Sequence, residues 1–334
     1  MSQADALSVR RAQKAAPALS PPARVLWVLF LIACVAVALY LTIGVTDWGF
    51  ALPRRARKVL AMALVGFAVS YSTVLFQTVT NNKILTPSII GFDALYVLIQ
   101  TGMTFLFGAM FLVYLDARSL FLMNVGVMIL FAGVLYRRLF GREGAHLYFL
   151  VLIGVVFGTL FSNLSNFMQR LLDPNEFLVL QTSLFASINN VDEDLLLIAV
   201  LSIAAVTLYS LRFAPYLDVL ALGRETAINL GVEHAMTVNR LMIVIAVLVS
   251  VSTALVGPIT FFGLLVANVA YQVMPAYHHR YLIPAAGLIS VIALAGGQLL
   301  IERVFHFQTT ISVVVNFAGG LYFLYLVLKQ ARSG

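Results

Sequence analysis

The chain has 334 residues, of which 61% are hydrophobic and only 10% are charged, and its mean hydropathy is +0.98. Soluble globular domains carry roughly 25% charged residues, so this composition excludes a soluble domain and predicts an integral membrane protein. The formal net charge of +7 does not require a nucleic-acid partner, because basic residues in membrane proteins mainly record orientation. The single cysteine, Cys34, excludes a disulfide framework and a cysteine metal cluster.

Apolar stretches of about 20 residues are typical of membrane-spanning helices, and the sequence contains ten. The first is too long for a signal-peptide core, so we expect it to be retained. The seventh and eighth are the least distinct pair, and Pro258 predicts a tight turn between them. We therefore predict an all-α membrane protein with one transmembrane domain at residues 25–329 and cytoplasmic tails at residues 1–24 and 330–334. The predicted spans lie near residues 25–45, 58–78, 91–114, 119–136, 147–168, 194–211, 239–257, 258–276, 281–300 and 310–329.

The distribution of basic residues predicts the orientation of these spans, because cytoplasmic loops are rich in lysine and arginine. With ten spans, both termini lie on the same side of the membrane. Placing the termini in the cytoplasm puts 14 of the 21 basic residues inside and seven outside. The inside set is Arg10, Arg11, Lys14, Arg24, Lys83, Arg137, Arg138, Arg142, Arg212, Arg224, Arg240, Arg280, Lys329 and Arg332.

One basic cluster, "RRARK" at residues 54–58, falls on the predicted extracytoplasmic side and opposes this rule. Two explanations remain open at this point. The boundaries of the first two spans are misplaced, or the cluster is an extracytoplasmic basic patch that attracts an acidic partner.

The fifth span ends in the polar stretch "SNLSN", which is unusual for a membrane helix. Ser162, Asn163, Ser165 and Asn166 lie near its outer end. Such side chains either face a water-filled path or form hydrogen bonds to a neighbouring helix, and the sequence leaves both alternatives open. In the outer segment that follows, "NEFLVLQTSLFASI" predicts a short helix at the membrane interface.

The longest predicted cytoplasmic connection spans about residues 212–238. Within it, two glycines flank Arg224–Leu230, which predicts a helix of about two turns, and a further short helix is predicted at residues 214–222. We expect Ala227 and Leu230 to share one face of the first of these helices. Helices this short are marginal alone, so they require either the lipid surface or a groove on a partner protein.

Ionisable residues within the predicted spans are few, and none suggests a proton relay. We expect Asp93 to be an interfacial charge or helix cap, and Glu302 and His306 to be solvated at the end of a span. "YHHR" at residues 277–280 is expected to be a solvated basic turn. The sequence contains no phosphate-binding loop and no HExxH, GxSxG or CxxC motif.

Four stretches together resemble the permeases of type II ABC importers, the family that carries iron–siderophore complexes, haem and cobalamin. "LDVLALGRETAINLGV" resembles the family's coupling segment, and the similarity extends from about Val65 to Lys329. The other three stretches are "VGFAVSYSTVLFQTVTNNKILTPSIIGFDALY", "TALVGPITFFGLLVANVAYQVM" and "HRYLIPAAGLISVIALAGGQLLIERVF".

The sequence departs from the family pattern at three places. The usual Pro-His-Ile-x-Arg is replaced by Ala267–Tyr271, the usual Glu-x-Pro-x-Gly by "FQTTIS", and the usual Asn-Pro by Asn82-Lys83, with a proline later at Pro87. These departures point away from the cobalamin branch. "TNNKILTPSIIGFD" is most similar to permeases for catecholate-type siderophores.

The resemblance implies a permease subunit in a bacterial cytoplasmic (inner) membrane, with no ATPase site and no cofactor or metal of its own. It implies two ATP-binding-cassette subunits that bind ATP and Mg, and an extracytoplasmic binding protein that delivers a ferric siderophore. It also implies a second permease subunit, for which a paralogue is favoured over an identical copy.

The resemblance also implies three sets of functional residues. The coupling set contacts the ATPase, the docking set contacts the binding protein, and the polar residues of the fifth span line the translocation path, with an inner gate near residues 137–146. The coupling set is Leu222, Gly223, Arg224, Glu225, Thr226, Ala227, Leu230 and Gly231, the docking set is Arg55, Arg57, Lys58 and Arg303, and the path set is Ser162, Asn163, Ser165 and Asn166.

Two other classes of function compete with the importer. An ion-gradient-driven secondary transporter of a small organic solute would require an ionisable residue at mid-span, and the sequence offers no convincing one. A membrane scaffold or lipid-modifying enzyme is the third alternative. It would require a catalytic cluster at a membrane face, for which only residues 277–280 are a candidate.

Overall fold

A computed structural model describes residues 20–45, 47–140, 147–185, 188, 191–306 and 309–333, and the described chain is almost entirely helical. The predicted all-α class is confirmed. The elements are α2 (Pro21–Thr42), α3 (Trp48–Thr80), η1 (Pro87–Ile90), α4 (Phe92–Phe107), α5 (Ala109–Tyr114), α6 (Ala117–Phe140), α7 (Leu147–Leu171), α8 (Pro174–Leu184), α9 (Glu193–Ser210), η2 (Leu211–Phe213), α10 (Ala214–Leu220), α11 (Arg224–Asn229), α12 (His234–Val256), α13 (Phe262–Val273), α14 (His279–Arg303) and α15 (Ile311–Ser333).

Each of the ten predicted spans corresponds to a helix or helix pair in the structure. Among the described residues, seven helical stretches are long and apolar enough to cross a membrane, and α4, α13 and the apolar part of α15 are shorter apolar helices. The seventh and eighth spans are separate helices, because α12 ends at Val256 and Gly257 adopts a left-handed φ of 91° before Pro258. Helix α15 continues to Ser333, so most of the predicted C-terminal tail is helical. Residues 1–19 of the predicted N-terminal tail and residues 141–146 of the predicted inner gate lie outside the described residues.

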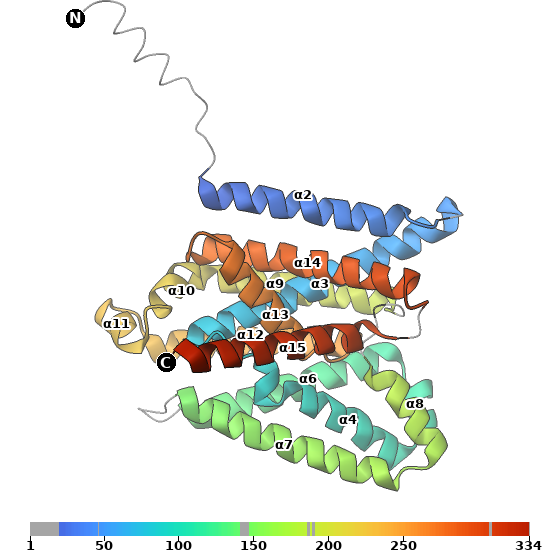
Figure 1. Cartoon of the computed structure of the whole chain (residues 1–334). Helices are drawn as coiled ribbons and strands as arrows, with labels where there is room; N and C mark the ends of the chain where they lie inside the picture. Colours follow the sequence, from blue (N-terminus) through green and yellow to red (C-terminus); the bar gives the residue numbers. More distant parts are fainter. Residues whose placement is uncertain are drawn as a thin grey trace, which may run out of the picture.

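Helices α3 and α12 form the centre of the molecule and pack against each other (Figure 1). Most of helix α12 is buried, because it also contacts α6 and α9. Helix α14 lies between α3 and the peripheral α2, while α4 and α7 pack together on the opposite side of the centre (Figure 1). Cys34 is exposed on α2.

The pairing of α7 with η1 depends on glycine. A Cβ atom on Gly154 would lie 2.7 Å from the Cα atom of Ile90, and a Cβ atom on Gly91 would lie 2.8 Å from the Cα atom of Gly158. Gly91 also has a φ of 95°, which side chains rarely adopt. These contacts bring two backbones together more closely than larger residues allow, a common means of helix association in membranes.

Helix α3 is longer than a helix needs to be to cross a membrane, and its basic residues lie near its N-terminal end. Its 33 residues extend over about 50 Å, against a hydrocarbon core of about 30 Å. Asp47 caps the N-terminus by accepting hydrogen bonds from the amides of Gly49 (3.0 Å) and Phe50 (3.3 Å). The basic stretch begins at Arg54, in the second turn. It therefore lies close to the end of the molecule at which α3 begins and α14 ends.

Candidate functional site

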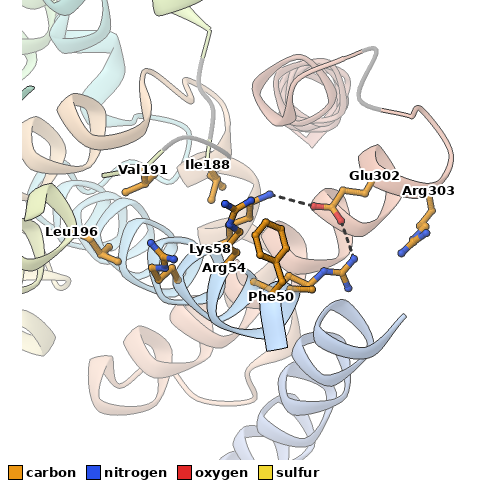
Figure 2. Close-up of a pocket in the computed structure, with 11 residues that line it drawn as sticks. Phe50, Arg54, Lys58, Ile188, Val191, Leu196, Glu302 and Arg303 are labelled. Carbon is orange, nitrogen blue, oxygen red and sulfur yellow. Dashed lines mark ion pairs between the residues drawn. The ribbon is translucent and has the colours of Figure 1, made fainter. Parts of the chain in front are cut away.

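A cavity of about 570 Å³ lies where the start of α3, the end of α14 and the start of α9 meet. Its described lining residues include five basic side chains, from both α3 and α14, and the carboxylate of Glu302 (Figure 2). Ile188, Val191 and Leu196 provide an apolar wall. The basic lining residues are Arg54, Arg55, Arg57, Lys58 and Arg303. All four predicted docking residues thus line one cavity, although Arg303 is remote from the others in sequence.

Glu302 is the centre of this basic cavity, and the prediction that it is solvated is wrong. Its side chain is 7% exposed because α14 packs against both α2 and α3. Its carboxylate lies 3.6 Å from Nη2 of Arg55 and 3.8 Å from Nζ of Lys58 (Figure 2). It also accepts hydrogen bonds from the hydroxyl of Tyr40 (3.0 Å) and from Nε2 of Gln298 (3.2 Å). A carboxylate buried among these donors holds two of the predicted docking residues in place.

The remaining basic side chains are more accessible. Arg57 pairs with Glu193 at the start of α9, and both side chains are largely exposed. Arg303 points away from Glu302 (Figure 2) and donates to the carbonyl of Ile43 at 2.7 Å. Its guanidinium lies against Gly44, where a Cβ atom would collide with it. Five positive charges against one described lining carboxylate leave the cavity strongly basic, which favours an acidic partner.

The four polar residues of the fifth span divide into two groups in α7. Ser162, Asn163 and Asn166 are exposed on the surface of the chain, whereas Ser165 is buried and donates to the carbonyl of Phe161 at 2.8 Å. The structure therefore brings three of the four to an open face of a membrane helix. Exposed amides there require water or another protein, because lipid cannot satisfy them. Near this end of α7, Asn166 lines an open cavity of about 590 Å³ between α7 and α8.

The short helix α8, at Pro174–Leu184, confirms the helix predicted between the fifth and sixth spans. Asp173 caps it by accepting a hydrogen bond from the amide of Asn175 at 2.9 Å. Pro174 at the first helical position suits a helix start, because its missing N–H would have no partner there. Leu178 and Val179 are exposed on its surface, which leaves α8 with an accessible apolar face.

The predicted coupling segment forms two short helices, α10 and α11, both slightly shorter than predicted. Helix α11 ends at Asn229 in a Schellman motif: the amide of Gly231 donates to Ile228 (2.9 Å) and that of Val232 to Ala227 (3.0 Å). The motif requires the left-handed φ of 84° at Gly231. Leu230 is 61% exposed whereas Ala227 is fully buried, so the two residues do not share a buried face.

Only one residue of the coupling set anchors α11 to the rest of the chain. Ala227 is fully buried, and Gly223 and Gly231 provide the left-handed turns before and after the helix. The other members of the set are exposed, and two of them are leucines that are each 61% exposed. These exposed members are Leu222, Arg224, Glu225, Thr226 and Leu230. A helix of six residues that carries exposed charges and is flanked by two exposed leucines is suited to contact with another protein.

Two further ionisable groups lie where the sequence did not predict them. Asp93 lines a small internal cavity of about 20 Å³, and its Oδ2 accepts a hydrogen bond from the hydroxyl of Thr260 at 2.8 Å. The prediction of an interfacial charge is therefore wrong, because α3, η1, α12 and the connection between α12 and α13 surround this cavity. His279 is 4% exposed and contacts Asp218, so the predicted solvated turn is also wrong at this residue. No sequence signal identified Asp218 or Glu302, whose partners lie far along the chain.

These features define a polytopic α-helical membrane protein, with a basic cavity at one end and two short helices at the other. Residues 37–329 match the FecCD transport family, and the chain belongs to that family. It is therefore a permease subunit of a bacterial ABC importer that works with other subunits, and the ion-driven carrier is not supported.

Several proteins are similar over nearly their whole length. The petrobactin import system permease protein YclO of Bacillus subtilis (strain 168) is 53% identical, over 90% of this chain and 96% of its own. The petrobactin import system permease protein FatC of Bacillus anthracis is 36% identical, over 92% and 90% of the two chains. A solved inward-facing structure of a metal-chelate type ABC transporter covers 92% of this chain and 99% of its own with a TM-score of 0.77. At 22% identity it supports the fold alone.

Proposed function

We propose that this permease imports a ferric siderophore of the catecholate type, with petrobactin as the first candidate. The observation that carries this proposal is the 53% identity to a petrobactin import permease across 96% of that relative's length. The second relative, at 36% identity, is also a petrobactin import permease by name. The chelator surrounds the iron, so the transport path needs no metal ligands of its own. We expect no cofactor in this chain, and ATP and Mg on the partner ATPase subunits.

The basic cavity is the proposed docking site for an extracytoplasmic binding protein. Its net positive charge and its position at one end of the spans support this role. Arg57 and Arg303 are the more accessible members, while Arg55 and Lys58 are held by Glu302. Pairs at such a rim contribute orientation and association rate more than affinity. In this topology both termini and α11 lie in the cytoplasm, and residues 25–329 form one transmembrane domain.

The exposed residues of α11 are the proposed contact with an ATP-binding-cassette subunit, and the exposed polar face of α7 is the proposed lining of the path. Ser165 is excluded from that lining because it is buried and its hydroxyl donates to the carbonyl of Phe161 in the same helix. A second permease, which we propose to be a paralogue, completes the path from the opposite side. An exposed row of amides is then covered by water within the dimer rather than by lipid.

Uptake of radiolabelled ferric petrobactin by a strain lacking this gene tests the proposal. We expect uptake to be lost in the deletion strain and restored by the wild-type chain. Ferric hydroxamate, haem and cobalamin uptake serve as controls and should be unchanged. Retention of petrobactin uptake, with loss of one of the control substrates, would refute the proposed substrate and leave the family assignment intact.

Affinity purification of the tagged chain from native membranes tests the partners. We expect an ATPase subunit and a second permease with a different sequence to co-purify. A complex in which two copies of this chain are the only permease subunits would refute the paralogue proposal. Cysteine labelling from each side of the membrane, at exposed Leu222 and Trp48, tests the proposed orientation.

A further inference from the structure

Helices α3 and α14 run antiparallel next to each other, and each connects the basic cavity to the opposite end of the molecule (Figure 1). Their close packing depends on small residues. A Cβ atom on Gly66 would lie 2.6 Å from Oγ of Ser290, and one on Gly287 would lie 3.3 Å from the ring of Phe67. Tight contact of this kind makes the two helices a stiff pair, because packed interiors transmit displacement rather than absorb it.

At the basic cavity, ion pairs connect the adjoining ends of α3 and α14. Glu302 of α14 bridges Arg55 and Lys58 of α3, as described above. Arg55 also donates to the carbonyls of Tyr40 (2.6 Å) and Ile43 (2.9 Å) at the C-terminal end of α2. Any displacement of these side chains in the basic cavity therefore affects the adjoining ends of both α3 and α14.

The other end is tied by Asp218, which lies on α10, the helix directly before the coupling helix α11. Its Oδ1 accepts a hydrogen bond from the backbone amide of His279 at 2.9 Å and lies 2.6 Å from Nδ1 of the same residue. Its Oδ2 lies 2.9 Å from Nδ1 of His278. His278 provides no side-chain cap for α14, so a carboxylate from another helix caps it instead.

The connection continues from α14 to α3. Nε2 of His279 lies 2.7 Å from the hydroxyl of Thr78 near the end of α3, and both residues are buried. Asn81, the C-cap of α3, donates to the carbonyl of Leu220 at the end of α10 with a length of 3.3 Å. The ends of α3 and α14 are thus both attached to α10.

We propose that Asp218 is a positioning residue that links α11 to the helix pair α3–α14, and through this pair to the basic cavity. A displacement of α11 moves α10, and Asp218 and Asn81 carry that displacement to the near ends of both helices. In the reverse direction, occupation of the cavity by a binding protein changes the position of α11. This inference rests on the proposed roles of the cavity and of α11.

The test uses the complete importer in liposomes, with its second permease, its ATPase subunits and its loaded binding protein. Asp218→Asn keeps an Oδ1 that can accept from the amide of His279, so α14 stays capped, but it removes the charge that faces both histidines. Thr78→Val removes the hydroxyl that His279 contacts and preserves the side-chain shape. Glu233→Gln is the matched control, because this exposed carboxylate near α11 provides no capping hydrogen bond.

We expect both test variants to assemble and to keep the ATPase rate measured without binding protein. Stimulation of that rate by loaded binding protein should fall roughly fivefold or more, in the usual range of coupling between two sites. Uptake should fall with it, and Glu233→Gln should match the wild type. A role of Asp218 in capping alone predicts normal stimulation in Asp218→Asn.

The outcomes separate this linkage from the function on which it rests. Normal stimulation in both Asp218→Asn and Thr78→Val overturns the linkage while the importer itself still works. A wild-type importer that shows no ATP-driven uptake overturns the proposed function and the linkage together. If Asp218→Asn does not assemble, Thr78→Val, which leaves the contact between Asp218 and His279 intact, decides the result.

Discussion

Replacement of Glu302 by glutamine tests the central contact of the basic cavity. The substitution keeps the shape of the side chain and its ability to accept from Tyr40, but it removes the negative charge that Arg55 and Lys58 share. Arg55 is only 14% exposed, so it cannot regain full hydration when its partner is lost. It keeps two carbonyl partners, which limits the effect. The variant should therefore be destabilised but still able to fold.

The magnitude follows from these contacts. Removing one partner of a fully buried ion pair costs about 3–5 kcal/mol, and a hydrogen bond to a charged group contributes about 1.5–3 kcal/mol. The pair at Glu302 is partly open to the cavity, and the N–O distances are long for strong pairs. We therefore expect a loss of about 2 kcal/mol, between the values for exposed and fully buried pairs.

Glu193→Gln is the matched control, because it removes the same charge from an ion pair at the same end of the molecule. Glu193 is 67% exposed and Arg57 is 43% exposed, so that substitution should cost no more than about 0.5 kcal/mol. The assay heats both detergent-purified variants and measures the remaining monodisperse protein by size-exclusion chromatography. Equal midpoints for Glu302→Gln and Glu193→Gln would show that Glu302 is not an internal anchor.

Three further substitutions test other parts of the structure. Gly231→Pro removes the amide that ends α11, and proline cannot adopt the φ of 84° found at this position. ATP-dependent uptake should therefore be abolished, while the amount of protein in the membrane, measured by immunoblot, should be unchanged. Normal uptake would contradict the coupling role. Gly154→Ala forces a Cβ atom against Ile90 and should cost about 1–3 kcal/mol in the same heating assay. Gly126→Ala, which meets open space, should be neutral or stabilising, and equal effects of the two would refute the close packing of α7. Arg303→Glu should slow association of the binding protein by about tenfold or more at low salt in surface-capture kinetics, and an unchanged rate would exclude it from the docking site.

The helices could be predicted from the sequence because each span must satisfy its backbone internally and be apolar for about 20 residues. The break between α12 and α13 was predictable for a local reason, since Pro258 and the left-handed Gly257 both oppose a continuous helix. The end of α11 was equally local, because Gly231 suits the turn that closes it. Such local features depend only on residues that are adjacent in the chain, so they can be recognised in a single sequence.

The internal contacts of the site could not be predicted in the same way. Glu302 lies at the end of an apolar run, where solvation is the ordinary expectation, and only the packing of α14 against α2 and α3 encloses it. Its partner Arg55 is on a helix near the other end of the chain. The burial of Asp93 and His279 could not be predicted for the same reason, because it depends on distant elements and not on their own flanking residues. Ser165 is buried while its polar neighbours are exposed, because it lies on a different face of α7, and a cluster of polar residues in the sequence does not specify which of them is buried.

The exposed position of Cys34 on the peripheral helix α2 has a practical consequence for measurement. Because no other cysteine occurs in the chain, one substitution to serine or alanine there removes every native thiol, and it does so without disturbing a packed interior. Pairs of spin labels or fluorophores can then be attached at chosen sites, such as α11 and the rim of the basic cavity. Distances between the labels would report how the two ends of the permease rearrange during a single catalytic cycle of its motor.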